Sequence, residues 1–486
     1  HANASTLVII TGKTALNGVP STHSPQPYQI EHDLLARAGL RTLAPINLTI
    51  EDAVLEACAT SENLKHRPML SMLAGPQVTT AFLIASQLNP AASTNTTVLA
   101  PARPMAPPTH RIGIDLRTLA HSDSMARGIG KFTTQHLAAL CDADPGLRVI
   151  GYTQHDSGSL PTALRRPQIT TMSIDDYSPE QVDLIHIPDP MNMSFGFDSP
   201  TRVLRHQHTT ATFHDLTPLH LYLDQWPQAN RDGYLDRLHQ LERGNCHLLT
   251  NSVFTAEDTL AHTSIPKERV TPILAGLHHD GGHPPTPEEI AAVHERLGIN
   301  GPFVLHVGAL DPHKNFHSAL NAFLMTRATK PLQMVVVGSV DPGITQAAAL
   351  CSKRNVPDVI FTGYLPRDLL NALYASATSL LFMSRAEGFG LPILEAMAKG
   401  CPVIASNATS HPEVAGDAAF LVDPDDQAGA ADHIRQLLQN QALRREHQTR
   451  GRRQAASFTW RDTAQRTLTT WHAMLASNKH APTFVG

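Results

Sequence analysis

Short apolar runs separated by helical patterns recur along the chain from residue 111 onward. The first set of runs lies at residues 112–114, 149–151, 184–186, 210–213 and 248–250. A second set lies at residues 303–308, 334–338, 359–361, 379–382, 402–405 and 419–422. Strands that alternate with helices indicate a parallel sheet covered by helices on both faces. The pattern therefore predicts two doubly wound α/β domains in series.

Residues 1–105 follow a different pattern. They hold an apolar strand candidate at residues 7–10, helical patterns at 50–59 and 81–88, and then a stretch rich in Thr, Ala and Pro at 95–108. Such a stretch is typical of a linker. We interpret residues 1–105 as an appended unit and linker of unknown role. The chain begins with His1 rather than Met, so we expect a start that is processed, tagged or cut from a longer protein.

The same pattern predicts the remaining boundaries. We expect an N-terminal Rossmann-like domain at 106–275, a hinge at 276–300, a C-terminal Rossmann-like domain at 301–460, and at 461–486 a helix returning to the N-terminal domain, with a tail. Gly, His and Pro cluster within the predicted hinge. Its histidines lack carboxylate or cysteine partners at ligand spacing, which favours a linker over a metal site.

Composition and charge narrow the class of protein. Lys and Arg total 38 against 43 Asp and Glu, a net charge of −5 with no long basic block, so nothing favours general binding to nucleic acid. The five cysteines are scattered singly, which favours a reducing compartment over a disulfide framework. No apolar run reaches the roughly 20 residues of a membrane-spanning helix. We therefore expect a soluble cytoplasmic protein; peripheral membrane contact and the oligomeric state stay open.

Residues 384–400 combine glycines and carboxylates at a predicted turn from strand to helix. Gly388 and Gly390 allow close backbone approach and Pro392 suits a first helical turn, so backbone amides should point outward and bind an anion. Glu387 and Glu395 bracket this turn with seven residues between them. Because a carboxylate accepts pairs of hydroxyl donors, one glutamate can bind the hexose and the other the ribose of a nucleotide sugar. The helix dipole would explain either glutamate alone, but not both together with the glycines.

With this Glu-x7-Glu spacing, the sequence resembles glycosyltransferase family 4 over roughly 370 residues. The resemblance implies retaining enzymes with the GT-B fold, in which two Rossmann-like α/β domains face each other across a cleft. Residues 308–315 resemble the first loop of the family's donor domain, whose lysine, Lys314 here, neutralises the donor diphosphate. Residues 362–365 resemble the loop beside the base, and residues 406–424 resemble the family's C-terminal run.

Two segments of the first domain extend the resemblance. Residues 127–131, with Gly128 and Gly130, resemble the glycine loop that faces the diphosphate, although the same spacing also occurs at ordinary helix starts. Residues 212–219 are similar to the segment whose histidine, His214 here, contacts the donor sugar near its reactive carbon. A position at a strand end is where α/β domains bind ligands.

The resemblance thus implies catalytic roles for Glu387, His214 and Lys314. It implies donor-binding roles for Gly128, Gly130, Gly308, Gly363, Tyr364, Gly388, Phe389, Gly390, Leu391 and Glu395. This sequence departs from the family in one respect, because many members have an arginine where this chain has Ala309. We expect Lys314 to bind the diphosphate alone or with His313, Arg385 or helix dipoles.

Residues 387–392 and 412–419 together resemble the bacterial mannosyl- and rhamnosyltransferase branch. This implies transfer of a hexose, mannose from GDP-mannose, to a glycan, lipid-linked or other acceptor in polysaccharide or glycoconjugate synthesis. We expect no cofactor and no metal, because the Asp-x-Asp patterns at 142–144 and 423–425 lie at predicted helix ends, where Asp caps. A UDP- or dTDP-sugar donor, a GT-B epimerase or phosphorylase, and a non-catalytic sugar-nucleotide-binding module stay as alternatives.

Overall fold

The computed structural model describes residues 110–119, 128–154, 160–192, 204, 206–277, 283–338, 347–348, 351–352 and 356–477. The chain divides into two compact units, His1–Pro104 and Met105–Gly486, and all of the described residues belong to the second. The strand and helices predicted within residues 1–105 lie outside the described residues, as do the middle of the predicted hinge at 278–282 and the predicted tail from residue 478.

Seven parallel strands form the first sheet, in the order β3-β2-β1-β4-β5-β6-β7. They are β1 (Arg111–Asp115), β2 (Arg148–Thr153), β3 (Ile169–Ser173), β4 (Leu184–Ile187), β5 (Thr209–Phe213), β6 (His247–Thr250) and β7 (Val270–Pro272). The strand order reverses between β1 and β4, and α/β proteins bind ligands beside such a reversal. Strands β4 and β5 are buried along their whole length, as expected where both faces of a sheet are covered.

Six parallel strands form the second sheet, in the order β10-β9-β8-β11-β12-β13. They are β8 (Phe303–Val307), β9 (Gln333–Val337), β10 (Val359–Gly363), β11 (Ser379–Phe382), β12 (Val403–Ser406) and β13 (Ala419–Val422). This order also reverses at its centre, between β8 and β11. The two all-parallel sheets confirm the prediction of two doubly wound α/β domains.

Helices follow most of the strands. In the first domain they are α5 (Gly128–Ala143), α7 (Thr217–Leu221), α8 (Gln228–Arg243) and α9 (Val253–His262). The later ones are α10 (Pro287–Leu297), α11 (Phe316–Arg327), α13 (Arg367–Ser376), α14 (Leu391–Ala398), α15 (His411–Ala415), α16 (Gln427–Gln439), α17 (Gln441–Ala456) and α18 (Trp460–Ser477). Short 3-10 turns occur at Arg117–Leu119, Thr162–Leu164, Ile174–Asp176, Pro179–Gln181, Leu223–Gln225, Lys267–Arg269 and Pro312–Lys314.

The apolar pattern missed β3 and β7, which are the two edge strands of the first sheet. Strand β3 reads Ile-Thr-Thr-Met-Ser and exposes its two threonines, so it lacks the apolar run of a central strand. Strand β7 has three residues and ends at Pro272, whose nitrogen has no hydrogen to donate to a neighbouring strand. Edge strands need neither continuous burial nor a complete hydrogen-bond ladder, so their sequences carry a weaker signal.

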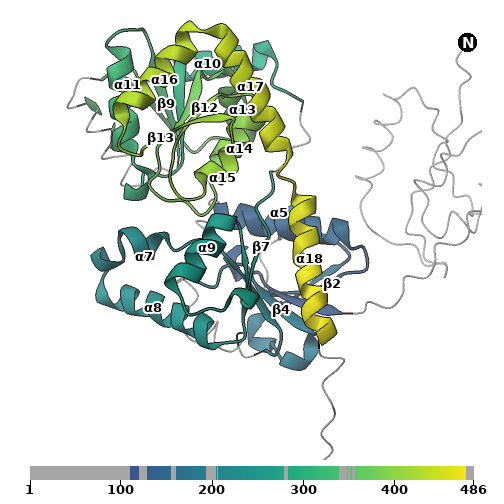
Figure 1. Cartoon of the computed structure of the whole chain (residues 1–486). Helices are drawn as coiled ribbons and strands as arrows, with labels where there is room; N and C mark the ends of the chain where they lie inside the picture. Colours follow the sequence, from purple (N-terminus) through teal and green to yellow (C-terminus); the bar gives the residue numbers. More distant parts are fainter. Residues whose placement is uncertain are drawn as a thin grey trace, which may run out of the picture. The chain divides into compact units, whose positions relative to one another are not determined.

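The last helix, α18, packs against the first sheet rather than the second. Its apolar residues Ala464, Leu468, Trp471 and Leu475 join the core formed by β1 and α5. Trp471 Nε1 also donates a hydrogen bond to Thr210 Oγ1 of β5 at 3.1 Å. Figure 1 shows α18, in yellow, beside α5, in blue. The chain therefore crosses from the first domain to the second and back again.

The two crossing segments touch each other through their backbones. Leu277 N donates to Phe458 O at 2.9 Å. A Cβ atom added to Gly276 would lie 2.4 Å from Trp460 N and 2.7 Å from the Thr459 carbonyl carbon, far inside van der Waals contact. Glycine is thus required where the chain leaves the first domain.

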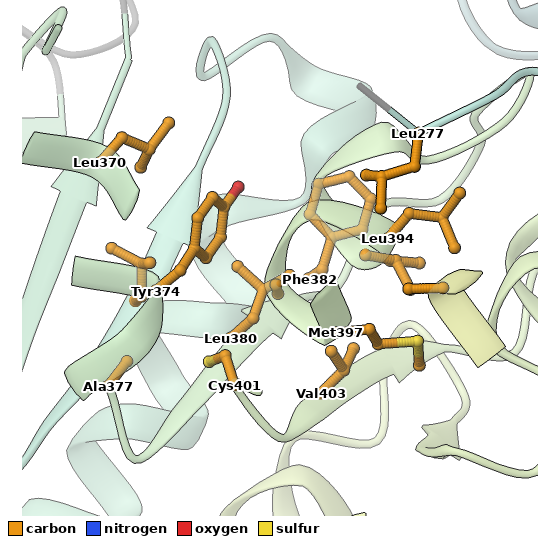
Figure 2. Close-up of a cluster of buried hydrophobic side chains, with 14 of the residues drawn as sticks. Leu277, Leu370, Tyr374, Ala377, Leu380, Phe382, Leu394, Met397, Cys401 and Val403 are labelled. Atoms are coloured by element: carbon orange, nitrogen blue, oxygen red, sulfur yellow. The ribbon is translucent and has the colours of Figure 1, made fainter. Parts of the chain in front are cut away.

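A buried apolar cluster fixes the start of α14 in the second domain. Leu380 and Phe382 of β11 pack with Leu394 and Met397 of α14, and all four side chains are at most 1% exposed. Figure 2 shows these side chains together with Val403 of β12. Because both elements are anchored in this core, the turn between them, which carries Glu387, has a fixed position.

Candidate active site

Glycines occupy the carboxyl ends of three neighbouring strands in the second sheet. Gly308 follows β8 with φ 140°, and Gly363 ends β10 with φ 70°, conformations that favour glycine. Between them, Gly338 donates its N–H to Gly363 O at 3.2 Å, and a Cβ on Gly338 would lie 2.2 Å from Gly308 O. The predicted Gly308 and Gly363 thus lie at one sheet edge with Gly338, which the sequence reasoning missed. Tyr364, also predicted, is 63% exposed beside them.

The turn before α14 has the shape that its glycines predict. Gly390 is the N-cap of α14 with φ 99°, and Pro392 lies in the first turn. The side chain of Phe389 is buried, and its ring centroid lies 5.7 Å from that of Phe458. Phe389 therefore serves the core with its side chain and leaves only its backbone for a ligand. Leu391 is partly buried against the same core.

Lys314 and Glu387 form an ion pair at the centre of these loops. Lys314 Nζ lies 2.6 Å from Oε1 and 2.8 Å from Oε2 of Glu387, and the two side chains are 18% and 14% exposed. Burial by itself would raise the pKa of Glu387, but the positive charge of Lys314 and the hydrogen bonds that it donates outweigh this effect and lower the pKa. The carboxylate is therefore ionised and ready to accept hydrogen bonds.

The backbone around Glu387 is held by the loop after β12. Glu387 N donates to Thr409 Oγ1 at 3.1 Å, while Ser410 Oγ donates to the carbonyl oxygens of Glu387 and Phe389 at 2.9 and 2.8 Å. Thr409 has φ 49°, which is uncommon for a β-branched residue. Such strain is found where the surroundings fix a functional loop. Sequence reasoning included this segment in the resemblance without assigning roles to its hydroxyl groups.

His411 lies buried beneath the turn and was not predicted. Its Nδ1 lies 2.8 Å from Ser406 Oγ, and its ring packs against Gly390, where a Cβ would come within 3.2 Å of Cδ2. Burial lowers the pKa of His411 to about 4, against the opposing effect of Glu387. Within the described residues, Nε2 of this neutral ring has no hydrogen-bond partner. His411 belongs to the site because it packs against Gly390, a residue that is distant from it in sequence.

The second glutamate of the pair, Glu395, has two partners from α13. Arg367 Nη1 lies 2.5 Å from Oε1, and Tyr374 donates its hydroxyl hydrogen to Oε2 at 3.1 Å. Burial, followed by the charge of Glu395, raises the pKa of Tyr374 well above its ordinary value. Arg367 and Tyr374 therefore hold the Glu395 carboxylate in one orientation. Neither Arg367 nor Tyr374 was predicted.

His214 meets the Glu387 turn from the first domain. Its Nε2 donates to Pro188 O at 3.0 Å, since a carbonyl can only accept. A Cβ on Gly388 would lie 2.0 Å from His214 O. The same region is bridged by Ser252 Oγ and Thr255 Oγ1, which donate to Gly388 O at 2.7 and 3.1 Å. The predicted His214 and Gly388 are thus in direct backbone contact.

The predicted Gly128 and Gly130 form the first turn of α5, and residues 120–127 before them lie outside the described residues. Gly128 is exposed and has no neighbouring heavy atom within 4 Å of an added Cβ. One turn further on, the ring centroid of Phe132 lies 5.3 Å from that of His214. The amino end of α5 therefore lies close to His214.

The two side chains expected to supplement Lys314 have different surroundings in the structure. Arg385 forms two hydrogen bonds with Asp425, at 2.9 and 2.5 Å, and donates its backbone N–H to His313 O at 2.7 Å. His313 Nδ1, by contrast, has no hydrogen-bond partner in the described part of the chain. Burial is the main cause that lowers the pKa of His313. His313 is thus a neutral hydrogen-bonding group beside Lys314, whereas Arg385 is already paired.

Comparison with known proteins identifies the family of this chain. Residues 290–454 match the family described as "Glycosyl transferases group 1". The chain is 31% identical over 282 residues to "O-antigen chain mannosyltransferase B" of Escherichia coli, which is 56% of this chain and 72% of that protein. It is 30% identical over 280 residues to "Serotype-specific mannosyltransferase WbdA" of Escherichia coli, which is 56% of this chain but only 34% of that protein. The chain belongs to the glycosyl transferases group 1 family.

The fold agrees with this assignment. Sucrose-phosphate synthase from Thermosynechococcus elongatus superimposes with a TM-score of 0.59 at 21% identity, over 76% of this chain and 99% of that one. At this identity the likeness concerns the fold alone, which is GT-B. The predicted glycosyltransferase with a GT-B fold is therefore confirmed, and the protein is a glycosyltransferase. Every helix in the described ranges is too short or too polar to span a membrane.

Proposed function

We propose that this glycosyltransferase moves mannose from GDP-mannose to a glycan or lipid-linked acceptor, with retention of the anomeric configuration, in the synthesis of a polysaccharide or glycoconjugate. The two Escherichia coli relatives, both named as mannosyltransferases, support mannose as the transferred sugar. The resemblance to glycosyltransferase family 4 supports retention. The observation that carries the proposal is the Lys314–Glu387 ion pair at the turn before α14.

The ion pair can serve both halves of a nucleotide sugar at once. The ammonium group of Lys314 has three hydrogen atoms to donate, and it contacts both carboxylate oxygens of Glu387. A diphosphate arriving beside Lys314 would share the ammonium and also meet the amides at the start of α14. Glu387 keeps further lone pairs with which to accept hydroxyl hydrogens of the sugar. We therefore place the diphosphate on Lys314 and the hexose on Glu387.

The proposed reaction breaks the bond between the anomeric carbon and the diphosphate oxygen, and the electron pair leaves with the diphosphate. Positive charge then develops on the sugar ring, near the Glu387 carboxylate, and negative charge develops near Lys314 and the turn amides. The acceptor oxygen bonds to the anomeric carbon on the face that the diphosphate leaves, and its proton passes to the departing phosphate oxygen. His214, which contacts Gly388 through its carbonyl, borders the sugar from the other domain.

The nucleotide end of the donor belongs beside Gly363, Tyr364 and Glu395. Tyr364 is exposed at the carboxyl end of β10, where a base could stack on its ring. Glu395 is fixed by Arg367 and Tyr374 and would accept the ribose hydroxyl hydrogens. A UDP- or dTDP-sugar would use the same three residues, so the choice of GDP rests on the resemblance to the mannosyl- and rhamnosyltransferase branch rather than on these contacts.

A donor panel tests the proposal. The purified protein would be incubated with GDP-mannose, UDP-glucose and dTDP-rhamnose, each with and without a mannose-terminated oligosaccharide, and the nucleoside diphosphate and the extended product would be measured. We expect a product only from GDP-mannose and only with the acceptor. Preference for a UDP- or dTDP-sugar would overturn the donor. Release of nucleoside diphosphate independent of acceptor would instead indicate an epimerase-like enzyme, and binding without turnover a binding module.

A further inference from the structure

Two histidines and an aspartate gather on the first domain and take no part in the Lys314–Glu387 pair. His220 belongs to α7, while Asp258 and His262 belong to α9. His220 Nε2 lies 2.9 Å from both carboxylate oxygens of Asp258, and His262 Nδ1 lies 3.0 Å from Oδ1 of the same carboxylate. All three ligand atoms lie within 4.8 Å of one another. Three side chains from two helices therefore converge on one point.

The side-chain chemistry is that of a transition-metal site. Two imidazole nitrogens with one carboxylate oxygen are ligands that suit Zn²⁺, whereas Mg²⁺ and Ca²⁺ prefer oxygen alone. Zinc binds such atoms at about 2.0–2.2 Å, which separates tetrahedral ligand atoms by roughly 3.3 Å. The two nitrogen–oxygen separations, 2.9 and 3.0 Å, are slightly shorter than this, and all three ligand atoms lie within 4.8 Å of one another, so the side chains would have to shift to admit an ion.

The burial of the cluster also suits a metal ion. The Asp258 side chain is 8% exposed, whereas those of His220 and His262 are 31% and 48% exposed. A carboxylate removed from water needs a cation or several hydrogen bonds. The two rings lie with centroids only 4.7 Å apart on the same carboxylate, so one divalent cation could bind all three groups. The exposed side leaves room for a water ligand in a fourth position.

The cluster ties together two helices that support the donor site. Residue Thr217 at the start of α7 donates its backbone N–H to Asp215 Oδ1 at 2.9 Å, directly after His214. In the first turn of α9, Thr255 Oγ1 donates to His214 O at 3.2 Å and to Gly388 O at 3.1 Å. Fixing α7 on α9 would therefore fix the loop that carries His214.

We propose that His220, Asp258 and His262 form a structural Zn²⁺ site that fastens α7 to α9 and holds the His214 loop in place. This ion does not contact the donor, so the proposal is independent of the donor sugar and of a metal-free transfer step. Hydrogen bonding without an ion is the competing account. In it, His220 Nε2 donates to the Asp258 carboxylate and His262 Nδ1 donates to the Asp258 backbone carbonyl oxygen at 3.0 Å, a bond that zinc binding at this nitrogen would have to replace. The two accounts differ in whether zinc binds here.

Calorimetric titration of chelator-treated protein with ZnCl₂ tests the site. We expect one tight equivalent per chain and a rise in melting temperature on saturation. His220→Ala and Asp258→Asn should each weaken this equivalent by about 100-fold or more, since even indirect partners of a ligand matter by 10–100-fold. The matched control is His239→Ala, which removes an exposed histidine of α8 from a chain that has 28.

Each result of the titration either supports the zinc site or overturns it. Retention of the tight equivalent in His220→Ala or Asp258→Asn, or its loss in His239→Ala, would place the zinc elsewhere and overturn the proposal. Absence of a tight equivalent in the wild type would establish hydrogen bonding alone. Because a variant can lose zinc by misfolding, each melting curve is compared with that of the zinc-free wild type. Equal melting temperatures without zinc, together with lost binding, support the site, and His262→Gln provides a second variant if Asp258→Asn is unstable.

Discussion

Lys314 and Glu387 lie 73 residues apart in sequence, yet they form a two-contact ion pair at 2.6 and 2.8 Å. The pair joins the loop after β8 to the turn before α14, and Arg385 N reinforces this link by donating to His313 O. The positive charge of Lys314 keeps the pKa of Glu387 low in a largely buried position. Replacing one of them should therefore alter the electrostatics of the whole donor site.

Glu387→Ala should reduce turnover more than Glu395→Ala. Glu387 is assigned to the reacting sugar, and losing a charged hydrogen bond costs roughly 1.5–3 kcal/mol, or about one to two orders of magnitude in rate if the bond is made fully in the transition state. Glu395 is assigned to the ribose, so Glu395→Ala should chiefly raise the donor KM. Steady-state kinetics of both variants, with folding checked by melting temperature, measures the difference. Near-normal kcat and kcat/KM in Glu387→Ala would contradict the site.

Gly388→Ala should disrupt the contact between the two domains. A Cβ at this position would lie 2.0 Å from His214 O, so the turn and the His214 loop must separate. A displacement near 1 Å at a catalytic group can cost about 100-fold in rate, and we expect a loss of that order in kcat/KM. Gly301→Ala is the matched control, because no heavy atom lies within 4 Å of its added Cβ. Equal activity in the two variants would show that the contact is unimportant.

Glu413 of α15, in the second domain, should stabilise the protein by binding the start of α9 in the first domain. Its two carboxylate oxygens accept the backbone N–H groups of Val253 and Phe254 at 2.9 and 3.0 Å, at the positive end of α9. Glu413→Gln should lower the free energy of unfolding by about 1–2 kcal/mol. Urea unfolding measures this, with Glu257→Gln, an exposed glutamate of α9, as the control. A loss no larger than that of the control would refute the role.

Acid should destabilise the protein well above the ordinary pKa of carboxyl groups. Burial lowers the pKa of His136 to about 3 and those of His306 and His411 to about 4. Below pH ~6.5 these histidines are protonated in the unfolded chain but stay neutral in the folded protein. The free energy of unfolding therefore falls as the pH drops from ~6.5 towards 4. Each ring contributes about 1.4 kcal/mol per pH unit below pH ~6.5 and little above it, so between pH 7.5 and 5.5 each should cost about 1.4 kcal/mol and the three together roughly 4 kcal/mol.

Urea unfolding at several pH values tests this expectation. His411→Gln should make the stability profile shallower by about a third of that loss. His472→Gln, which replaces an exposed histidine of α18, should leave the profile unchanged. A free energy of unfolding that stays constant from pH 7.5 to 5.5 would exclude the buried neutral histidines.

The sequence predicted the strands that are buried on both faces. The apolar run at residues 379–382 coincides with β11, because a central parallel strand needs continuous apolar burial. The edge strand β3 has no such requirement, and its two exposed threonines interrupt the apolar run by which a strand is predicted. The local turn was equally predictable, since Gly390 and Pro392 determine the backbone geometry at the start of α14 within a few residues.

Contacts between distant segments could not be predicted from the sequence. Lys314 and Glu387 were singled out separately, but only the parallel order of β8 and β11 brings them together. Likewise, nothing near Glu395 in sequence points to Arg367, and nothing near Gly390 points to the ring of His411. The roles of these residues in transfer stay predictions.

Anomeric NMR of a single reaction tests the central claim most directly. Wild-type protein, GDP-mannose and a mannose-terminated oligosaccharide would be followed in one tube, and the configuration of the new glycosidic bond would be read from its anomeric signals. The account predicts transfer of one mannose with the α configuration of the donor kept, and a rate roughly 10- to 100-fold lower in folded Glu387→Ala. An inverted linkage, or no transfer from GDP-mannose by folded wild type, would contradict it.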